Sequence, residues 1–193
     1  MLTCVAIIPA RAGSSLRDKN IAQLGDRTLL EHAIQSARHK AVAEVVVTTD
    51  SPRYAEIAAG AGAFIVMRTP ELARDETPTD PCIVHALKRW VDAVFVPRAS
   101  GFRLPDVVAT LQADCPMRRQ TLMPEALERL EGEGADSLLC LTPLHFVWSR
   151  PDWGWDCAQG SRDRRGAYAK RPRRQDMTEP LRSWHETGLL YLT

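Results

Sequence analysis

The chain has 193 residues, of which 45% are hydrophobic and 25% charged, as expected for a globular domain with its own core. A formal net charge of +1 excludes a strong overall field for nucleic acid or an anionic membrane, and no apolar run approaches the roughly 18 residues of a membrane span. The N-terminus enters a strand-like run with no basic segment before it, and the five cysteines form no CxxC pair. These features favour a cytoplasmic protein with reduced thiols.

The first predicted element is a buried strand, because Val5–Ile8 is an uninterrupted apolar run that ends at Pro9. The loop after it is suited to a polyphosphate, because it offers backbone N–H groups, hydroxyls and cations. Its spacing matches neither GxxxxGK[ST] nor GxGxxG, so an ordinary loop with solvated charges is the alternative interpretation. The loop residues concerned are Arg11, Gly13, Ser14, Ser15, Arg17 and Lys19.

The next elements are predicted to alternate between helix and strand, which is the order of a parallel α/β sheet. Thr28 and Glu31 have the spacing of a capping box at the start of the first helix. Ligands of such sheets gather at the carboxyl ends of the strands. The elements are a helix over Thr28–Lys40, a strand over Glu44–Thr48, a helix over residues 52–60 and a strand over Ala63–Met67.

Asp50 follows the second strand, on the same predicted edge of the sheet as the loop after Ile8. Its sequence context favours a helix N-cap over a substrate contact. A polar stretch, Arg68–Asp80, then leads to a helix over Pro81–Val91. In that helix Trp90 has the spacing of a core residue, and an irregular surface loop is expected over Ala93–Pro105.

A later strand, Val107–Gln112, runs directly into a polar turn that contains Asp114. A carboxylate at this position is either a ligand for a hard cation or a cap of the turn or of the following helix, and both interpretations stay open. Cys115 is not interpreted as a nucleophile, because no histidine nearby in the sequence would activate it.

The last third of the chain changes character. A helix over 120–132 and a strand over Asp136–Thr142 precede a stretch, 143–182, rich in Trp and Arg and without clear periodicity. Such a segment is either a partner surface or a solvated basic loop. A final strand is expected near the end, over Thr187–Thr193.

The loop sequence IPARAGSSLRDKN resembles the signature IPARxGSKxxxxKN of the cytidylyltransferases that activate acidic sugars. These are the CMP-sialic acid synthetases, with the CMP-pseudaminic, CMP-legionaminic and KDO synthetases as relatives. Further similar segments follow in the family's order: TTDS, RTPELARDETPT, LQADCPMR and RRQD with GLLYL. Ser15 replaces the usual Lys of the loop, and Thr187 replaces an Asn.

The resemblance implies a three-layer, Rossmann-like α/β nucleotidyltransferase fold with a mostly parallel sheet. It implies one domain over 1–193, in which 143–182 is an arm for dimerisation and substrate binding, and therefore a homodimer. It also implies a reaction of CTP with a nonulosonic, sialic-type sugar acid to give a CMP-sugar and pyrophosphate. The small net charge and the lack of a long apolar run predict no nucleic-acid or membrane partner.

Family roles carried onto matching positions give the expected site. Arg11, Lys19 and Gln112 would act in catalysis, Gln112 and Arg174 would bind the sugar, and Asp114 would bind Mg²⁺. The nucleotide would contact Ala10, Arg11, Gly13, Ser14, Ser15, Asn20, Arg68 and Thr79.

Family members usually continue beyond the final strand with a carboxylate-rich segment that binds metal, whereas this sequence ends at Thr193. One alternative is therefore a non-catalytic or truncated module for nucleotide binding or dimerisation. The other is a KDO-type nucleotidyltransferase, because Asp114 fits the sequence pattern of the KDO synthetases.

Overall fold

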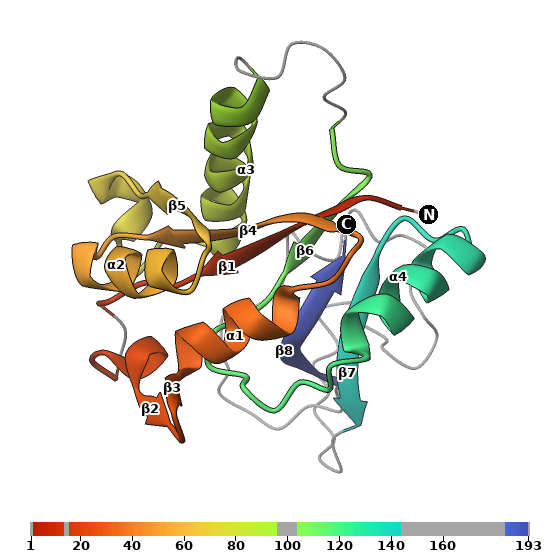
Figure 1. Cartoon of the computed structure of the whole chain (residues 1–193), viewed down its shortest axis with the longest axis horizontal. Coiled ribbons are helices and arrows are strands. Elements are labelled where there is room, and N and C mark those ends of the chain that lie inside the picture. The colour runs from red at the N-terminus through yellow and green to blue at the C-terminus, as the bar shows by residue number, and fades with distance from the viewer. Residues whose placement is uncertain (1, 14–15, 96–103, 144–183, 193) are drawn as a thin grey trace, which may run out of the picture. The chain divides into compact units, whose positions relative to one another are not determined.

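The computed structural model describes residues 2–13, 16–95, 104–143 and 184–192 (Figure 1). The chain divides into a larger unit, Met1–Cys140 with Gly188–Thr193, and a second unit, Leu141–Thr187. Of the second unit only the ends of two strands are described, so the predicted arm over 143–182 lies almost wholly outside the described residues.

The described strands form a six-stranded sheet in the order β5-β4-β1-β6-β8-β7. β1 pairs in parallel with β4 and with β6, β4 pairs in parallel with β5, and β8 pairs antiparallel to β6. The prediction of a mostly parallel sheet is therefore confirmed. The strands are β1 (Cys4–Pro9), β4 (Val42–Thr49), β5 (Phe64–Met67), β6 (Val107–Thr110), β7 (Leu138–Pro143) and β8 (Trp184–Leu192).

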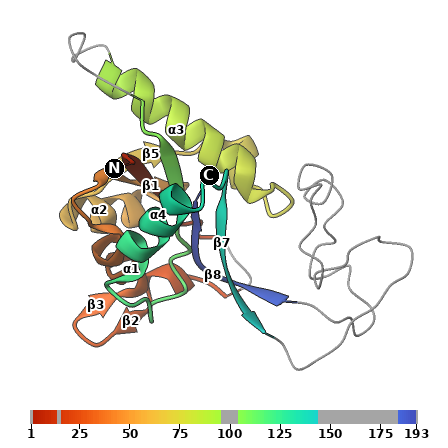
Figure 2. The same cartoon turned by 90° about the vertical axis from the view of Figure 1, so that its right-hand side faces the viewer.

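Helices cover both faces of this sheet, as Figure 2 shows from the side. α1 (Leu29–Ala37), α2 (Pro52–Gly60) and α4 (Leu122–Gly132) pack on one face, against Cys4, Ala6 and Ile8 of β1. α3 (Thr79–Phe95) packs on the other face, against Val5 and Ile7. Because successive side chains of a strand point to opposite faces, an uninterrupted apolar run is what a strand between two helical layers requires.

The predicted capping box is present at the start of α1. The Thr28 hydroxyl accepts from the Glu31 N–H at 3.3 Å, and the Glu31 carboxylate accepts from the Thr28 N–H at 2.7 Å. Hydrogen bonds from Thr28 lower the pKa of Glu31 below its usual value. The helix ends at Ala37, earlier than predicted, whereas α2 has the predicted bounds.

The largest difference from the predicted elements is α3, which is longer at both ends than Pro81–Val91. The helix continues to Phe95, so the prediction of an irregular loop beginning at Ala93 is wrong at that boundary. Val94 packs beside Val91 on the second face of the sheet, which extends the apolar side of the helix. Trp90, 3% exposed, is a core residue as predicted.

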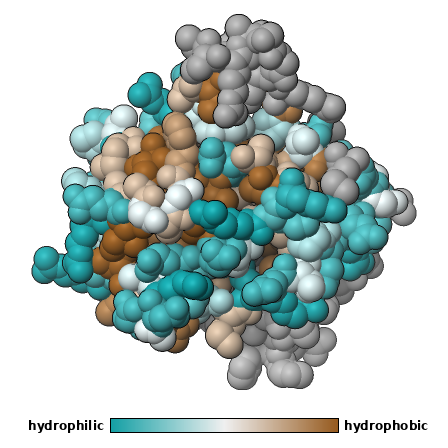
Figure 3. Space-filling model, in the orientation of Figure 1, coloured by the Kyte–Doolittle hydropathy of each residue, from teal (hydrophilic) through white to brown (hydrophobic). Residues whose placement is uncertain are grey.

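The remaining described elements are short. They are the 3-10 turns η1 (Lys19–Ile21) and η2 (Pro70–Ala73) and the hairpin of β2 (Gln23–Leu24) and β3 (Arg27–Thr28). Gly25 has a φ of 66° in the hairpin turn, a conformation that glycine adopts without strain. On the face that Figure 3 presents, hydrophilic and hydrophobic residues are intermingled. Among the described helices, none combines the length and the apolar character that crossing a bilayer requires.

Candidate functional site

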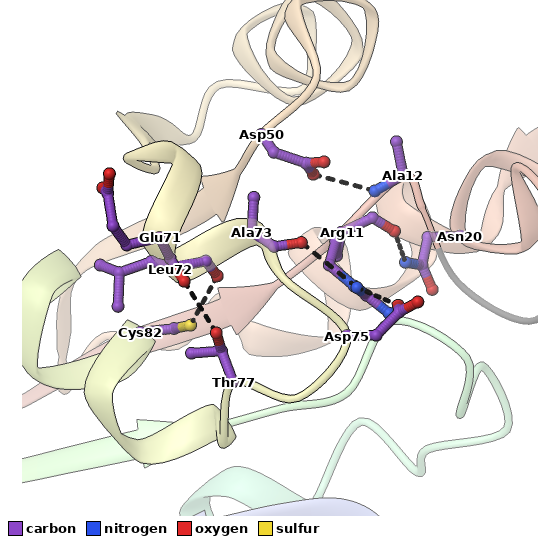
Figure 4. Close-up of polar contacts among 10 residues, drawn as sticks. All are labelled: Arg11, Ala12, Asn20, Asp50, Glu71, Leu72, Ala73, Asp75, Thr77 and Cys82. Carbon is purple, nitrogen blue, oxygen red and sulfur yellow. Dashed lines mark hydrogen bonds and ion pairs between the residues drawn. The ribbon is translucent and has the colours of Figure 1, made fainter.

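The loop after β1 is joined to β4 by the backbone and by one carboxylate. The Ala10 N–H donates to the Thr48 carbonyl at 2.9 Å. The Ala12 N–H donates to the Asp50 carboxylate at 2.9 Å, as Figure 4 shows. The prediction of Asp50 as a helix cap is wrong, because Ser51 is the N-cap of α2 and accepts from the Tyr54 N–H. Asp50 instead fixes the path of the loop.

Arg11 leaves this loop toward the segment 70–77, as Figure 4 shows. One guanidinium nitrogen donates to the Ala73 carbonyl at 3.2 Å and forms an ion pair with the Asp75 carboxylate. A hydrogen bond within the segment 70–77 stabilises it, because the Thr77 hydroxyl donates to the Glu71 carbonyl at 2.8 Å. The Arg11 side chain, 22% exposed, is therefore held in place before any ligand binds.

Asn20 and Lys19 lie where the same loop returns to the core. Asn20 is 6% exposed, and its side-chain amide donates to the Arg11 carbonyl at 3.1 Å. The Lys19 ammonium lies 2.9 Å from the carboxylate of Asp114, which follows β6. Two segments that are distant in the sequence thus meet at the carboxyl ends of adjacent parallel strands, as predicted for a ligand site in such a sheet.

Asp114 does not cap the next helix, because α4 begins at Leu122 and its N-cap residue is Thr121. The helix-cap alternative is therefore wrong, whereas the turn-cap alternative stays a prediction, and the Asp114 carboxylate is paired with Lys19. Among the described residues no three His, Cys, Asp or Glu side chains form a metal cluster. A lone carboxylate still fits Mg²⁺, which usually binds through one or two carboxylates together with substrate phosphates.

Gln112 lies just beyond the end of β6 and its side chain is exposed. The backbone carbonyl of Gln112 accepts from the Arg118 guanidinium, and the Cys115 N–H donates to the same backbone carbonyl at 3.4 Å. Burial lowers the pKa of Arg118, and burial raises the pKa of the Cys115 thiol. A thiol with a raised pKa is a poor nucleophile at neutral pH, in line with the sequence interpretation of Cys115.

Arg68 and Thr79 occupy different settings. The Arg68 guanidinium donates to the Thr48 hydroxyl at 3.2 Å and to the Thr48 carbonyl at 3.1 Å, at the end of β4. Its burial lowers the pKa of the guanidinium. Thr79 is exposed and is the first residue of α3. The predicted nucleotide contacts of both residues stay predictions.

An open pocket lies beside the loop after β1. Three charged side chains contribute to it: Arg17 and Asp18 from the loop and Arg53 from α2. The Asp18 carboxylate accepts from the buried Tyr54 hydroxyl at 3.3 Å. The sequence interpretation missed the link between Asp18 and Tyr54, because 36 residues separate them and no local pattern joins them. The pocket is lined by Ala12, Gly13, Arg17, Asp18, Ser51 and Arg53.

The structure thus brings most of the predicted residues to one edge of the sheet. Ala10, Arg11, Gly13, Lys19 and Asn20 lie in or beside the loop after β1. Gln112 and Asp114 follow the neighbouring strand β6, with Lys19 as the connecting side chain. Ser14, Ser15 and Arg174 lie outside the described residues.

The family model described as cytidylyltransferase matches residues 5–147. N-acylneuraminate cytidylyltransferase of Escherichia coli O18:K1:H7 is 38% identical over 126 residues, which are 64% of this chain and 27% of that protein. CMP-N,N'-diacetyllegionaminic acid synthase of Legionella pneumophila is 30% identical over 154 residues, which are 77% of this chain and 60% of that protein.

A solved structure titled CMP:2-keto-3-deoxy-manno-octonic acid synthetase complexed with CTP has a similar fold. Its TM-score is 0.56 at 24% identity, over 74% of this chain and 53% of that one. The chain spans between about a quarter and 60% of the length of the two curated relatives described above.

Proposed function

The chain belongs to the cytidylyltransferase family, and we propose that it couples CTP to a nonulosonic, sialic-type sugar acid, giving a CMP-sugar and pyrophosphate. The names of the relatives from Escherichia coli and Legionella pneumophila support this acceptor class. The observation that carries the proposal is the meeting of Lys19, from the loop after β1, with Asp114, after β6, at 2.9 Å. Their meeting brings the predicted triphosphate loop beside the predicted metal and sugar segment.

In the proposed reaction the anomeric hydroxyl oxygen of the sugar attacks the α-phosphorus of CTP. The bond from that phosphorus to the bridging oxygen of pyrophosphate breaks, and the hydroxyl proton is released. The protein positions the two reactants and stabilises charge, rather than forming a covalent intermediate. Arg11 and Lys19 supply positive charge for the phosphates, and Ser14 and Ser15 supply hydroxyl donors.

The remaining binding roles follow from the family resemblance. Asn20 is assigned to the ribose, Arg68 and Thr79 to the base side of the nucleotide, and Gln112 and Arg174 to the sugar acid. An arginine suits a carboxylate because its planar guanidinium donates two parallel hydrogen bonds. Ala10 and Gly13 are assigned backbone contacts with the nucleotide.

Mg²⁺ belongs to this proposal as the metal that offsets phosphate charge. Asp114 would hold it together with phosphate oxygens of CTP. In the structure the same carboxylate is paired with Lys19, so binding of metal and nucleotide would require these two groups to share or exchange partners.

We also propose a homodimer in the cytoplasm. The stretch 143–182 would form the contact between subunits, since Trp and Arg are favoured at protein interfaces. Cys4 and Cys82 are free thiols, which suits a reducing compartment. Size-exclusion chromatography with light scattering would test the dimer, and a mass of about 21.5 kDa in solution would contradict it.

The decisive experiment measures pyrophosphate release with Mg²⁺, comparing CTP with UTP, ATP and GTP, and offering sialic, legionaminic, pseudaminic and KDO acids. Release with CTP and a nonulosonic acid supports the proposal. Release with KDO alone supports the second candidate, a KDO-type enzyme, which the position of Asp114 favours. Binding of CTP by calorimetry without release for any acceptor would overturn catalysis and leave a nucleotide-binding module.

A further inference from the structure

Asp18 has an unusual backbone conformation for a residue with a side chain. Among the described residues it is the one non-glycine position with positive φ, at φ 55° and ψ 20°. This left-handed region is unfavourable for L-residues, although Asp and Asn tolerate it better than most. Such a conformation persists when the surrounding contacts fix it, and it clusters at functional sites.

Two side chains of α2 hold the Asp18 carboxylate. The Tyr54 hydroxyl donates to one oxygen at 3.3 Å, and the Arg53 guanidinium donates to the other at 3.4 Å. Tyr54 is 1% exposed and belongs to the main core cluster, so its position is set by packing. Burial, with a smaller contribution from the Asp18 charge, raises the pKa of Tyr54 to about 12, so the hydroxyl remains a donor near neutral pH.

Asp18 directly precedes the turn η1, which carries two residues of the proposed site. The Ile21 N–H donates to the Asp18 carbonyl at 3.1 Å, which closes this turn. Lys19, the next residue after Asp18, reaches Asp114 from the turn, and Asn20 reaches the Arg11 carbonyl. The backbone of Asp18 therefore bears on the direction in which the Lys19 side chain leaves the turn.

We propose that Asp18 is a positioning residue, anchored by Tyr54 and Arg53, that sets the direction of Lys19 in the site. This inference rests on the proposed function, because Lys19 is placed there at the phosphates. Asp18 itself is not a catalytic residue, since its carboxylate is turned to α2.

The sharpest variant is Tyr54→Phe, which removes one hydroxyl and keeps the core packing. We expect kcat to fall about 3- to 10-fold with the KM for the sugar unchanged, because misplaced charge affects the chemical step more than acceptor binding. Asp18→Ala should lower kcat further than Tyr54→Phe does. It removes the carboxylate that Tyr54 and Arg53 hold, and it strains the backbone, because alanine is unfavourable in the left-handed region. Asp18→Asn should restore kcat to within about 3-fold of wild type, because Asn tolerates the left-handed region and retains an acceptor oxygen.

A second readout does not depend on activity. A lysine-specific protease should cut after Lys19 several-fold faster in Tyr54→Phe and Asp18→Ala than in wild type, because a released loop reaches the protease more often. Cleavage after Lys40 and Lys88, mapped by mass spectrometry, is the internal control.

If the protease cuts after Lys19 no faster in Tyr54→Phe than in wild type, Tyr54 does not anchor Asp18, whether or not kcat falls. Faster cleavage with wild-type kcat would overturn the positioning role. If the wild-type chain releases no pyrophosphate, the proposed function fails, while cleavage after Lys19 still decides whether the anchor exists. If Asp18→Ala fails to fold, Tyr54→Phe and Asp18→Asn still give both readouts.

Discussion

Two loops lie at the same edge of the sheet but are held in different ways. The loop after β1 is hydrogen-bonded to other elements. Ala10 and Ala12 donate to residues at the end of β4, and Arg11 donates to the segment 70–77. The loop after β6 contacts the first loop through the pair of Asp114 with Lys19, whereas hydrogen bonds from Arg118 and Cys115 return to the backbone carbonyl of Gln112 within the same loop.

The difference matches two tasks in the proposed reaction. A loop fixed from several sides can present its donors to a triphosphate with little loss of freedom on binding, which is how preorganised sites gain affinity. The loop after β6 leaves Gln112 exposed and Met117 85% exposed, so side chains there can adapt to an acceptor. We infer that the first loop serves the constant nucleotide and the second serves the sugar acid.

The largest expected effect comes from removing the cation of the fastened loop. Arg11→Ala should lower kcat/KM by at least about 100-fold, because it removes a fixed charge from the transferring phosphates. Steady-state pyrophosphate release measures it. Arg74→Ala is the matched control, since it removes an exposed arginine from the neighbouring segment and should keep activity within about 2-fold. Equal activity of the two variants would contradict the role of Arg11.

Asn20→Ala tests whether the same loop is fastened from within. The variant loses the hydrogen bond to the Arg11 carbonyl at a position that is 6% exposed. We expect about 1–3 kcal/mol less stability in urea unfolding, and a CTP affinity about 10-fold weaker by calorimetry. A stable variant with wild-type affinity would show that the loop holds its shape without Asn20.

Gln112→Ala probes the second loop and should behave in the opposite way. Because its side chain is exposed, the midpoint of urea unfolding should shift little. The KM for the sugar acid should rise about 10-fold, the loss of one or two hydrogen bonds, while the KM for CTP stays the same. If the KM values for the sugar acid and for CTP rose together, the inference that the two loops bind different substrates would be wrong.

Local chemistry in the sequence was enough to predict most elements of the fold. The uninterrupted apolar run of β1 required a strand covered on both faces, and the Thr28–Glu31 spacing defined the start of α1. The end of α3 was missed, because its last turn depends on Val94 packing against the sheet. Asp50 and Ser51 are both good caps, so only the three-dimensional path of the loop decides between them.

The site was predictable only in part. The residues at the carboxyl ends of β1 and β6 followed from the expected sheet and from the family resemblance. Their pairing could not be predicted, because Lys19 and Asp114 are 95 residues apart and each looks like an ordinary surface charge in the sequence. Arg11 with Asp75 and Asp18 with Tyr54 were missed for the same reason, since tertiary contacts of this kind leave no periodic pattern.

The smallest expected effect concerns Cys115, which lies in the loop after β6 beside Asp114. Burial and the neighbouring carboxylate raise the pKa of its thiol, so the reactive thiolate is scarce at neutral pH and grows only as pH rises. Cys115→Ser should therefore keep kcat/KM within about 2-fold, and iodoacetamide at pH 7 should modify Cys115 more slowly than a free thiol, as mass spectrometry would measure. If the Ser variant lost activity while still binding CTP, this loop would contribute chemistry as well as acceptor binding, and the contrast between the two loops would no longer hold.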